Sequence, residues 1–250
     1  NDPYIGYQWH YHNEGTLYQT KPGADINLYE AWKIETGKPQ VIVAIIDGGI
    51  DTDHPDLKPN LWINEDEMNG ADGQDDDNNG YTDDIHGFNF VTNKGKITPH
   101  THGTHVAGTV GAVNNNGIGV AGVAGGDGTP ESGIRLMSCQ IFHTNEKNEE
   151  QSVKDEDRGK AFIYAANNGA VIAQNSWEYA WNGTEGQLMQ SDKDAIDYFI
   201  ARAGLDESDN QIGPLKGGIV IFATGNRDLN AKVLPSPYEK VFSVSSFGPD

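Results

Sequence analysis

Residues 41–57 read VIVAIIDGGIDTDHPDL, and this stretch decides the fold. Its first six residues are apolar without a polar break, which is typical of a strand buried on both faces of a parallel sheet. The run stops at Asp47, which is followed by two glycines. In open α/β sheets, ligands bind at the carboxyl edge of the strands. Taken alone, however, Asp-Gly-Gly is better explained as a turn.

The composition limits the classes of partner. The chain of 250 residues has 37 acidic against 17 basic residues, a formal charge of −20. This charge disfavours nucleic acid, because phosphates select for positive surfaces, and it is compatible with cation binding. No stretch is apolar for long enough to span a membrane. The single cysteine, Cys139, excludes an internal disulfide, and its apolar setting favours a buried side chain over a reactive thiol. A start at Asn1, without Met or signal peptide, suggests a processed or trimmed chain.

The segment before the apolar strand predicts an arm and a short helix. Residues 1–27 are aromatic and polar without a sustained period, so we expect an extended arm lying over the core. Residues 27–37 predict a helix with Asn27 as N-cap, Glu30 in capping-box position and Gly37 at the C-terminal end. Its expected apolar face consists of Leu28, Ala31 and Trp32.

Beyond residue 100 the pattern alternates between helix and strand. A helix is expected from His102, with Val106, Val110 and Val113 as a core-facing stripe. Further strands are expected at 134–141, 170–175, 218–223 and 241–245, and helices at 157–168 and 188–203. Residues 145–158 and 206–217 are expected to be exposed loops. This order predicts one domain with a doubly wound parallel sheet and right-handed crossovers.

Residues 65–90 form an acid-rich insertion. Asp75, Asp77 and Asn79, followed by Gly80, match the opening of a calcium-binding loop, and Asp83 and Asp84 follow. The twelfth position of such a loop holds His86 instead of the bidentate Glu. A solvated acidic turn is the alternative. Because crowded carboxylates repel one another unless a cation relieves them, the stretch favours Ca²⁺. The expected ligands are Asp75, Asp77, Asn79, Asp83 and Asp84.

A second motif decides between turn and catalytic site at Asp47. Residues 101–111 read THGTHVAGTVG, and together with 41–57 they resemble the Asp and His blocks of the subtilisin-like serine proteases. The resemblance implies a subtilisin-like α/β fold in which Asp47 orients His102 and His102 takes a proton from a serine. His105, one turn along the helix, is the competing candidate, but the family motif places catalysis on the first His.

Two further stretches resemble parts of the same site. GGIVIFATGNRD at 217–228 implies that Asn226 donates to the oxyanion, although a Gly-Asn turn would also explain it. VIAQNSW at 171–177 resembles the strand that lines the primary specificity pocket, which implies substrate contacts for Ser176, Trp177 and Glu178. The family usually has glycine where this chain has Glu178. A carboxylate facing the pocket would favour basic side chains, and one facing solvent would not; both orientations stay open.

The N-terminal sequence Asn1-Asp2-Pro3-Tyr4 resembles the thermitase group of the family, which implies a second calcium site. The implied ligands are the side chains of Asp2, Asp56 and Asn115 and the carbonyls of Val113, Ile118 and Val120. The loop carries one more residue than that of subtilisin, so which asparagine binds is open. Hard oxygen ligands from separate segments suit calcium.

The family's serine block, Gly-Thr-Ser-Met-Ala, does not occur in the 250 residues. We therefore expect the N-terminal part of a catalytic domain, inactive alone, whose remainder is a partner. The resemblance implies a secreted or cell-surface endopeptidase that acts on polypeptides. A non-catalytic binding module of the same fold is the alternative, and the presence of Asp47, His102 and Asn226 together favours the enzyme.

Overall fold

The computed structural model describes residues 2–17, 20–145, 147–178, 188–226 and 233–248. Its seven-stranded sheet has the order β2-β3-β1-β5-β6-β7, with every neighbouring pair parallel, and β4 pairs antiparallel with β3. The strands are β1 Ile42–Gly48, β2 Gly87–Asn89, β3 Arg135–Thr144, β4 Glu150–Ser152, β5 Ile172–Asn175, β6 Ile219–Ala223 and β7 Phe242–Val244. The helices are α1 Leu28–Ala31, α2 Glu65–Asn69, α3 Thr101–Gly111, α4 Lys160–Asn167 and α5 Gln190–Arg202, with short 3₁₀ turns at Ile5–Tyr7, Lys58–Asn60 and Asp155–Asp157.

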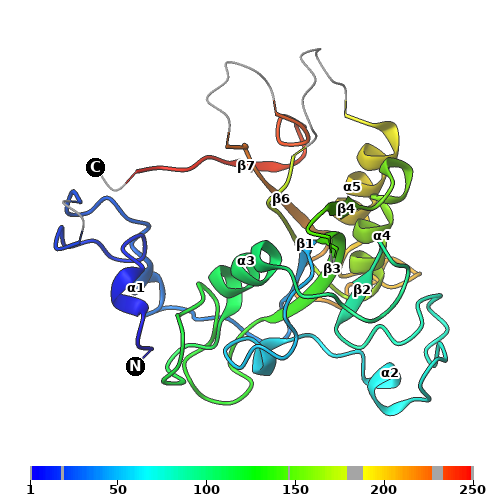
Figure 1. Ribbon diagram of the computed structural model, residues 1–250, viewed down its shortest axis with the longest axis horizontal. Coiled ribbons are helices and arrows are strands. Elements are labelled where there is room, and N and C mark those ends of the chain that lie inside the picture. Colours follow the sequence, from blue (N-terminus) through cyan, green and yellow to red (C-terminus); the bar gives the residue numbers. More distant parts are fainter. Residues whose placement is uncertain (1, 18–19, 146, 179–187, 227–232, 249–250) are drawn as a thin grey trace.

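Strand β1 lies in the middle of the sheet, as its apolar run predicts. Side chains alternate between the faces: Ala44 and Ile46 join the core under α4 and α5, while Val43 and Ile45 join the core under α3. Figure 1 shows α4 and α5 together on one side of the strands and α3 on the other. Helices on both faces of a parallel sheet confirm the predicted doubly wound α/β fold.

The register brings the ends of three strands to one edge. Ile46 of β1 lies beside Asn175 of β5, and Asn175 lies beside Phe222 of β6. The residues that follow these positions, among them Asp47, therefore emerge at the same carboxyl edge. The catalytic candidates predicted from the sequence, Asp47 and Asn226, come at the ends of two of these strands.

The predicted helix at 27–37 is wrong in length and in its cap. Only Leu28–Ala31 is α-helical, and Asn27 is left-handed at φ 53° with no side-chain cap bond. The reason is a local turn: Asp25 accepts the N–H of Asn27 at 2.7 Å and fixes the backbone outside the geometry of an N-cap. Glu30 pairs with Lys33 instead of closing a capping box, and Ala31 is exposed.

The valine stripe expected on α3 is confirmed only in part. Val106 and Val110 pack against the core as half-buried side chains, but Val113 lies beyond the helix, and the fully buried residues are Gly103, Ala107, Gly108 and Gly111. Close approach to the sheet explains this, because a Cβ on Gly103 would lie 2.0 Å from the carbonyl oxygen of Gly48. Small residues let the start of α3 rest directly on the end of β1.

Short elements occur in stretches that the pattern left as loop or insertion. Strands β2 and β4 extend the sheet beyond β3, and α2 begins the acidic insertion. The N-terminal arm packs through the buried Tyr11, whose hydroxyl donates to the carbonyl of Ala121 at 2.8 Å. Among the described residues, no helix combines the length and apolar character that crossing a membrane requires.

Candidate active site

Asp47 and His102 meet at the carboxyl edge of β1. The Nδ1 atom of His102 lies 2.7 Å from Oδ1 of Asp47. The Asp47 side chain is fully buried, whereas the His102 side chain is 48% exposed. Since Oδ1 accepts, Nδ1 carries the proton of the neutral ring and Nε2 is left free to accept a proton from a substrate-side group. This arrangement has the geometry that the base half of a nucleophilic catalytic site requires.

The surroundings of Asp47 fix its carboxylate. Oδ1 also accepts the backbone N–H of Gly48 at 2.7 Å, and Oδ2 has no hydrogen-bond partner among the described residues. The hydrogen bond to Asp47 raises the pKa of His102 above its ordinary value, against the opposing effect of partial burial. The charges of Asp47 and Glu150 raise this pKa further. The pair is therefore built to stabilise a protonated imidazole.

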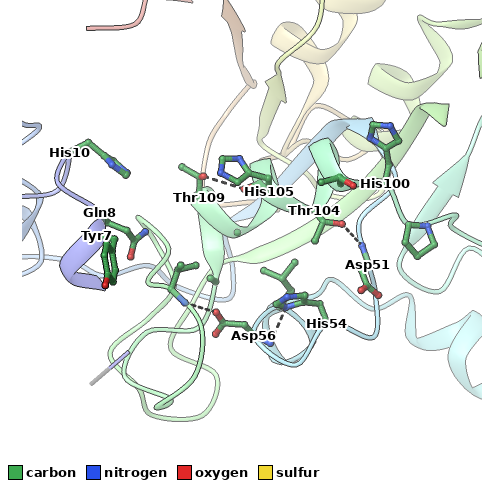
Figure 2. A pocket seen from close by; sticks show the side chains of 16 residues that line it. Tyr7, Gln8, His10, Asp51, His54, Asp56, His100, Thr104, His105 and Thr109 are labelled. Carbon is green, nitrogen blue, oxygen red and sulfur yellow. Dashed lines mark hydrogen bonds between the residues drawn. The ribbon is translucent and has the colours of Figure 1, made fainter. Parts of the chain in front are cut away.

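The competing histidine lies elsewhere. His105 is exposed, and it lines a cavity of about 670 Å³ between the N-terminal arm, α3 and the turn after β1. Figure 2 shows His105 on the outer side of α3, with His10 of the arm turned towards the same space. The side chain that reaches Asp47 is that of His102.

Asn226 is exposed just beyond the end of β6, at the same edge of the sheet as Asp47. The preceding Gly225 has a left-handed backbone, φ 92°, so the chain turns sharply after the strand. Thr224 anchors that turn by donating its N–H to the carbonyl of Val244 at 3.0 Å. An exposed amide at this edge has the chemistry of an oxyanion donor.

The segment after β5 turns its carboxylate inward. Oε2 of Glu178 is buried, and a Cβ on Gly225 would lie only 2.4 Å from it. Oε2 of the half-buried Glu178 thus lies against the backbone of the residue next to Asn226. Trp177 faces the core, where its ring meets Phe222 at 5.1 Å and Arg158 lies 5.4 Å from its centre.

Ser176, another predicted substrate contact of this segment, is engaged by a neighbouring side chain. The hydroxyl of Ser176 accepts from the Gln174 side chain at 2.9 Å. Tyr179 lies outside the described residues. Of the three predicted substrate contacts, Glu178 therefore has the side chain that is directed at the edge where Asn226 emerges.

Two buried carboxylates mark the N-terminal candidate calcium site. Asp2 accepts the N–H of Asn115 at 2.8 Å, and Asp56 accepts the N–H of Val120 at 2.9 Å. Burial raises the pKa of Asp56, and the charge of Asp2 raises it further. The side chain that reaches Asp56 is that of Asn116, at 2.7 Å, whereas Asn115 donates to the Asp127 carbonyl.

The same loop holds the implied carbonyl ligands. Val113 donates its N–H to the carbonyl of Asp56 at 2.9 Å, and Ile118 donates to the side chain of Asn116 at 2.9 Å. The structure therefore gathers the predicted segments around Asp56. Two buried carboxylates that repel each other, with an asparagine amide at one of them, offer the hard oxygen atoms that a divalent cation prefers.

The acidic insertion gathers a second set. Carboxylate oxygens of Glu67, Asp75 and Asp77 lie within 4.8 Å of one another. Asn79 joins them, because its side chain donates to Asp77 at 2.9 Å and to Asp84 at 3.2 Å. Asp83 is turned away and accepts the N–H of Gly73 at 2.9 Å.

Sequence reasoning missed Glu67. It is the buried residue of α2, and its carboxylate accepts the backbone N–H groups of Asp76 at 2.6 Å and Asp83 at 2.7 Å. The signal was weak, since Glu67 stands among three acidic residues of one helix and only its burial distinguishes it.

Asp84 ties the insertion to the core. It is fully buried, accepts the hydroxyl of Tyr164 on α4 at 2.5 Å and accepts from Asn64 at 3.0 Å. Burial raises the pKa of Asp84, and the nearby charge of Asp77 adds to the rise.

Comparisons with known proteins identify the family of the chain. Residues 38–249 match the Subtilase family, Peptidase S8. Subtilisin-like protease 1 of Plasmodium berghei (strain Anka) is 52% identical over 110 residues, 44% of this chain and 16% of that protein. The thermophilic serine proteinase of Bacillus sp. (strain AK1) is 26% identical over 98% of this chain and 45% of its own length. The chain thus spans less than half of each of these relatives.

A solved structure shows the same fold. The Aeromonas sobria serine protease, solved in complex with the chaperone ORF2, superposes with a TM-score of 0.57 at 22% identity. The match covers 90% of this chain and 32% of that one.

Proposed function

The chain belongs to the subtilase family, and from that premise we propose that it forms part of a calcium-binding serine endopeptidase. The observation that carries the proposal is the 2.7 Å contact between His102 Nδ1 and Asp47 Oδ1, which leaves Nε2 of this half-exposed ring as the atom that can accept a proton. An acyl-transfer site needs a base held in one tautomer by a buried carboxylate, and this pair meets that requirement.

In the proposed reaction, Nε2 of His102 takes the proton of a serine hydroxyl as the oxygen attacks the peptide carbonyl. Asp47 stabilises the resulting imidazolium, and the Asn226 amide donates to the oxyanion. His102 then gives the proton to the leaving amine, and water resolves the acyl-enzyme by the same route. The serine comes from a segment outside these 250 residues, because no serine here stands in a Gly-Thr-Ser-Met-Ala block.

An apolar surface supports a place for that segment. On the α3 side of the sheet, Ile219 and Ile221 of β6 are half-buried, and Phe242 and Val244 of β7 are 63% and 56% exposed. These positions share a face, because Ile221 is paired with Phe242 in parallel register. A contiguous apolar face of this kind needs a partner, and we propose the serine-bearing remainder of the domain.

For specificity, we propose that Glu178 selects basic side chains at the scissile bond. Its buried carboxylate beside Gly225 supports this choice over the solvent-facing alternative. Glu178→Gln should lower the ratio of kcat/KM for arginine over leucine peptides by about tenfold or more, because the arginine of the substrate would lose its carboxylate partner on binding. An unchanged ratio would contradict the proposal.

Calcium is proposed at both acidic sites. Asp2 and Asp56 hold one ion together with Asn116 or Asn115 and carbonyls of the loop, and Glu67, Asp75, Asp77 and Asn79 hold the other. When bound, calcium offsets carboxylate repulsion and fixes the loops, and it takes no part in the chemical step. A secreted or cell-surface location, where calcium is abundant, is part of the same proposal and is supported by the family alone.

The test compares two histidines of one helix in the protein expressed at the length of its relatives. His102→Ala should abolish peptide hydrolysis, whereas His105→Ala should retain it, because His105 does not contact Asp47. A non-catalytic binding module predicts no hydrolysis by the wild type. Equal activity of the two variants would refute the assignment of His102.

A further inference from the structure

His100, two residues before His102, joins three elements of the site. Its backbone N–H donates to the carbonyl of Gly49 at 2.8 Å, just beyond β1, and its carbonyl accepts the N–H of Thr104 at 2.9 Å in the first turn of α3. Its ring Nδ1 accepts the backbone N–H of His102 at 3.2 Å. At the other side of the ring, Nε2 lies 3.3 Å from Oγ1 of Thr144 at the end of β3.

These contacts define the tautomer of the ring. An N–H cannot donate to another N–H, so the Nδ1 atom that accepts from His102 carries no proton. In the neutral imidazole the proton is then on Nε2, where the Thr144 hydroxyl oxygen accepts it. Both ring nitrogens are engaged, and the orientation of the ring is fixed from two sides.

Packing holds the same ring against the backbone of the site. A Cβ on Gly48 would lie 2.6 Å from Nδ1 of His100, so the ring rests directly on the residue that follows Asp47. Phe142 of β3 meets the His100 ring edge-on at 5.2 Å and also meets the His102 ring at 6.2 Å. One side chain thus contacts β1, α3 and β3 where the Asp47–His102 pair is assembled.

We propose that His100 is a positioning residue that holds the first turn of α3 so that His102 keeps Nδ1 on Asp47. Ser, Thr, Asp and Asn are the usual N-cap residues, and they satisfy one helical N–H. The longer imidazole satisfies the same N–H and also reaches Thr144, which ties the cap to β3. The kinetic test of this inference rests on the proposed peptidase function. The NMR test, which observes the His102 ring itself, rests on the geometry alone.

The first experiment measures kcat and KM of His100→Ala, His100→Asn and Tyr11→Phe in the protein expressed at the length of its relatives. His100→Ala removes the acceptor for His102, and displacement of a catalytic group by about 1 Å can cost up to about 100-fold, so we expect a 10- to 100-fold loss in kcat with KM little changed. His100→Asn keeps an acceptor oxygen and should recover most of the loss. Tyr11→Phe removes the hydroxyl that donates to the Ala121 carbonyl at 2.8 Å and lies 3.5 Å from the Thr109 carbonyl, far along α3 from His102, and should lower stability without changing kcat.

The second experiment follows the His102 imidazole by NMR during a pH titration and needs no activity. In the wild type its pKa is raised by Asp47; His100→Ala should bring that pKa back towards the ordinary value of histidine, and His100→Asn should not. A wild type that hydrolyses no peptide would refute the proposed function while the titration still tests the positioning.

Two results would overturn the proposal. The first is a His100→Ala variant in which both kcat and the pKa of His102 are unchanged. The second is a His100→Asn variant whose kcat falls by about tenfold or more. The second result decides the question even if the alanine variant does not fold.

Discussion

Asp47 and His102 stand 55 positions apart in the chain, and the fold brings their side chains to 2.7 Å. The contact depends on small neighbours, because a side chain at Gly48 or Gly103 would collide with His100 or with the Gly48 carbonyl. The motif predicts which residues meet. It does not predict the exposed orientation of the His102 ring, which depends on the cap and on Phe142.

Asp47→Asn tests the electrostatic role of the carboxylate. Because the hydrogen bond to Asp47 raises the pKa of His102, the variant should move the acid limb of kcat/KM to lower pH. It should also reduce kcat by about 10⁴-fold, since the amide favours the wrong tautomer. The pH–rate profiles of both proteins check this, and an unmoved acid limb would contradict it.

The same pair affects stability in a defined pH window. The folded-state pKa of His102 lies above that of histidine in the unfolded chain. The stabilisation is therefore fully present below the unfolded pKa and is lost as pH rises through the folded pKa. Asp47→Asn should remove this pH dependence from the melting midpoint.

Asn226→Ala tests the oxyanion assignment. The amide is proposed to donate to charge that exists only in the transition state, so kcat should fall by about 10²–10³-fold with KM nearly unchanged. Steady-state kinetics of the protein at the length of its relatives measures both constants. A variant whose main defect is a raised KM would place Asn226 in substrate binding instead.

At the scale of elements, the acidic insertion is anchored to the core at Asp84 and Tyr164 and carries the cluster of Glu67, Asp75 and Asp77. Calcium should raise the free energy of unfolding by about 2.7 kcal/mol per site at 100 times the dissociation constant, and the melting midpoint should rise with it. Glu67→Gln should reduce this gain. Asp72→Asn, which removes the same charge from an exposed position of the same loop, should keep it.

Melting curves with chelator and with added calcium measure the effect. Midpoints that do not respond to calcium in the wild type would exclude both proposed sites. An equal loss in the Glu67 and Asp72 variants would indicate general screening of the acidic loop and not a specific ion.

The elements also show what sequence patterns can and cannot predict. The apolar run at 41–46 and the strand–helix alternation predict the parallel sheet, because burial on both faces leaves a continuous signal. The helix expected at 27–37 fails because Asn27 and Glu30 satisfy the capping pattern while Asp25 fixes a competing turn. Glu67 was missed because burial, not residue type, separates it from its acidic neighbours.

At the scale of the whole molecule, one face of the sheet is covered by α4 and α5, and the other is covered by α3 over β1 and β3 but leaves β6 and β7 open. In Figure 1 the stretch after β7 runs back to the N-terminal arm, where Phe247 meets Trp9 at 5.7 Å. The apolar strips of β6 and β7 lie on this face, and the Asp47–His102 pair and Asn226 lie at the carboxyl edge of the same sheet. A serine-bearing segment packed there would complete the site.

Labelling with a fluorophosphonate probe, followed by mass-spectrometric mapping, tests this account most directly. In the protein expressed at the length of its relatives, the probe should modify one serine outside these 250 residues, and His102→Ala should suppress the labelling while His105→Ala should not. Residues 1–250 alone should take no label. Stoichiometric labelling of a serine within these residues, or labelling that does not depend on His102, would contradict the assignment of the Asp47–His102 pair.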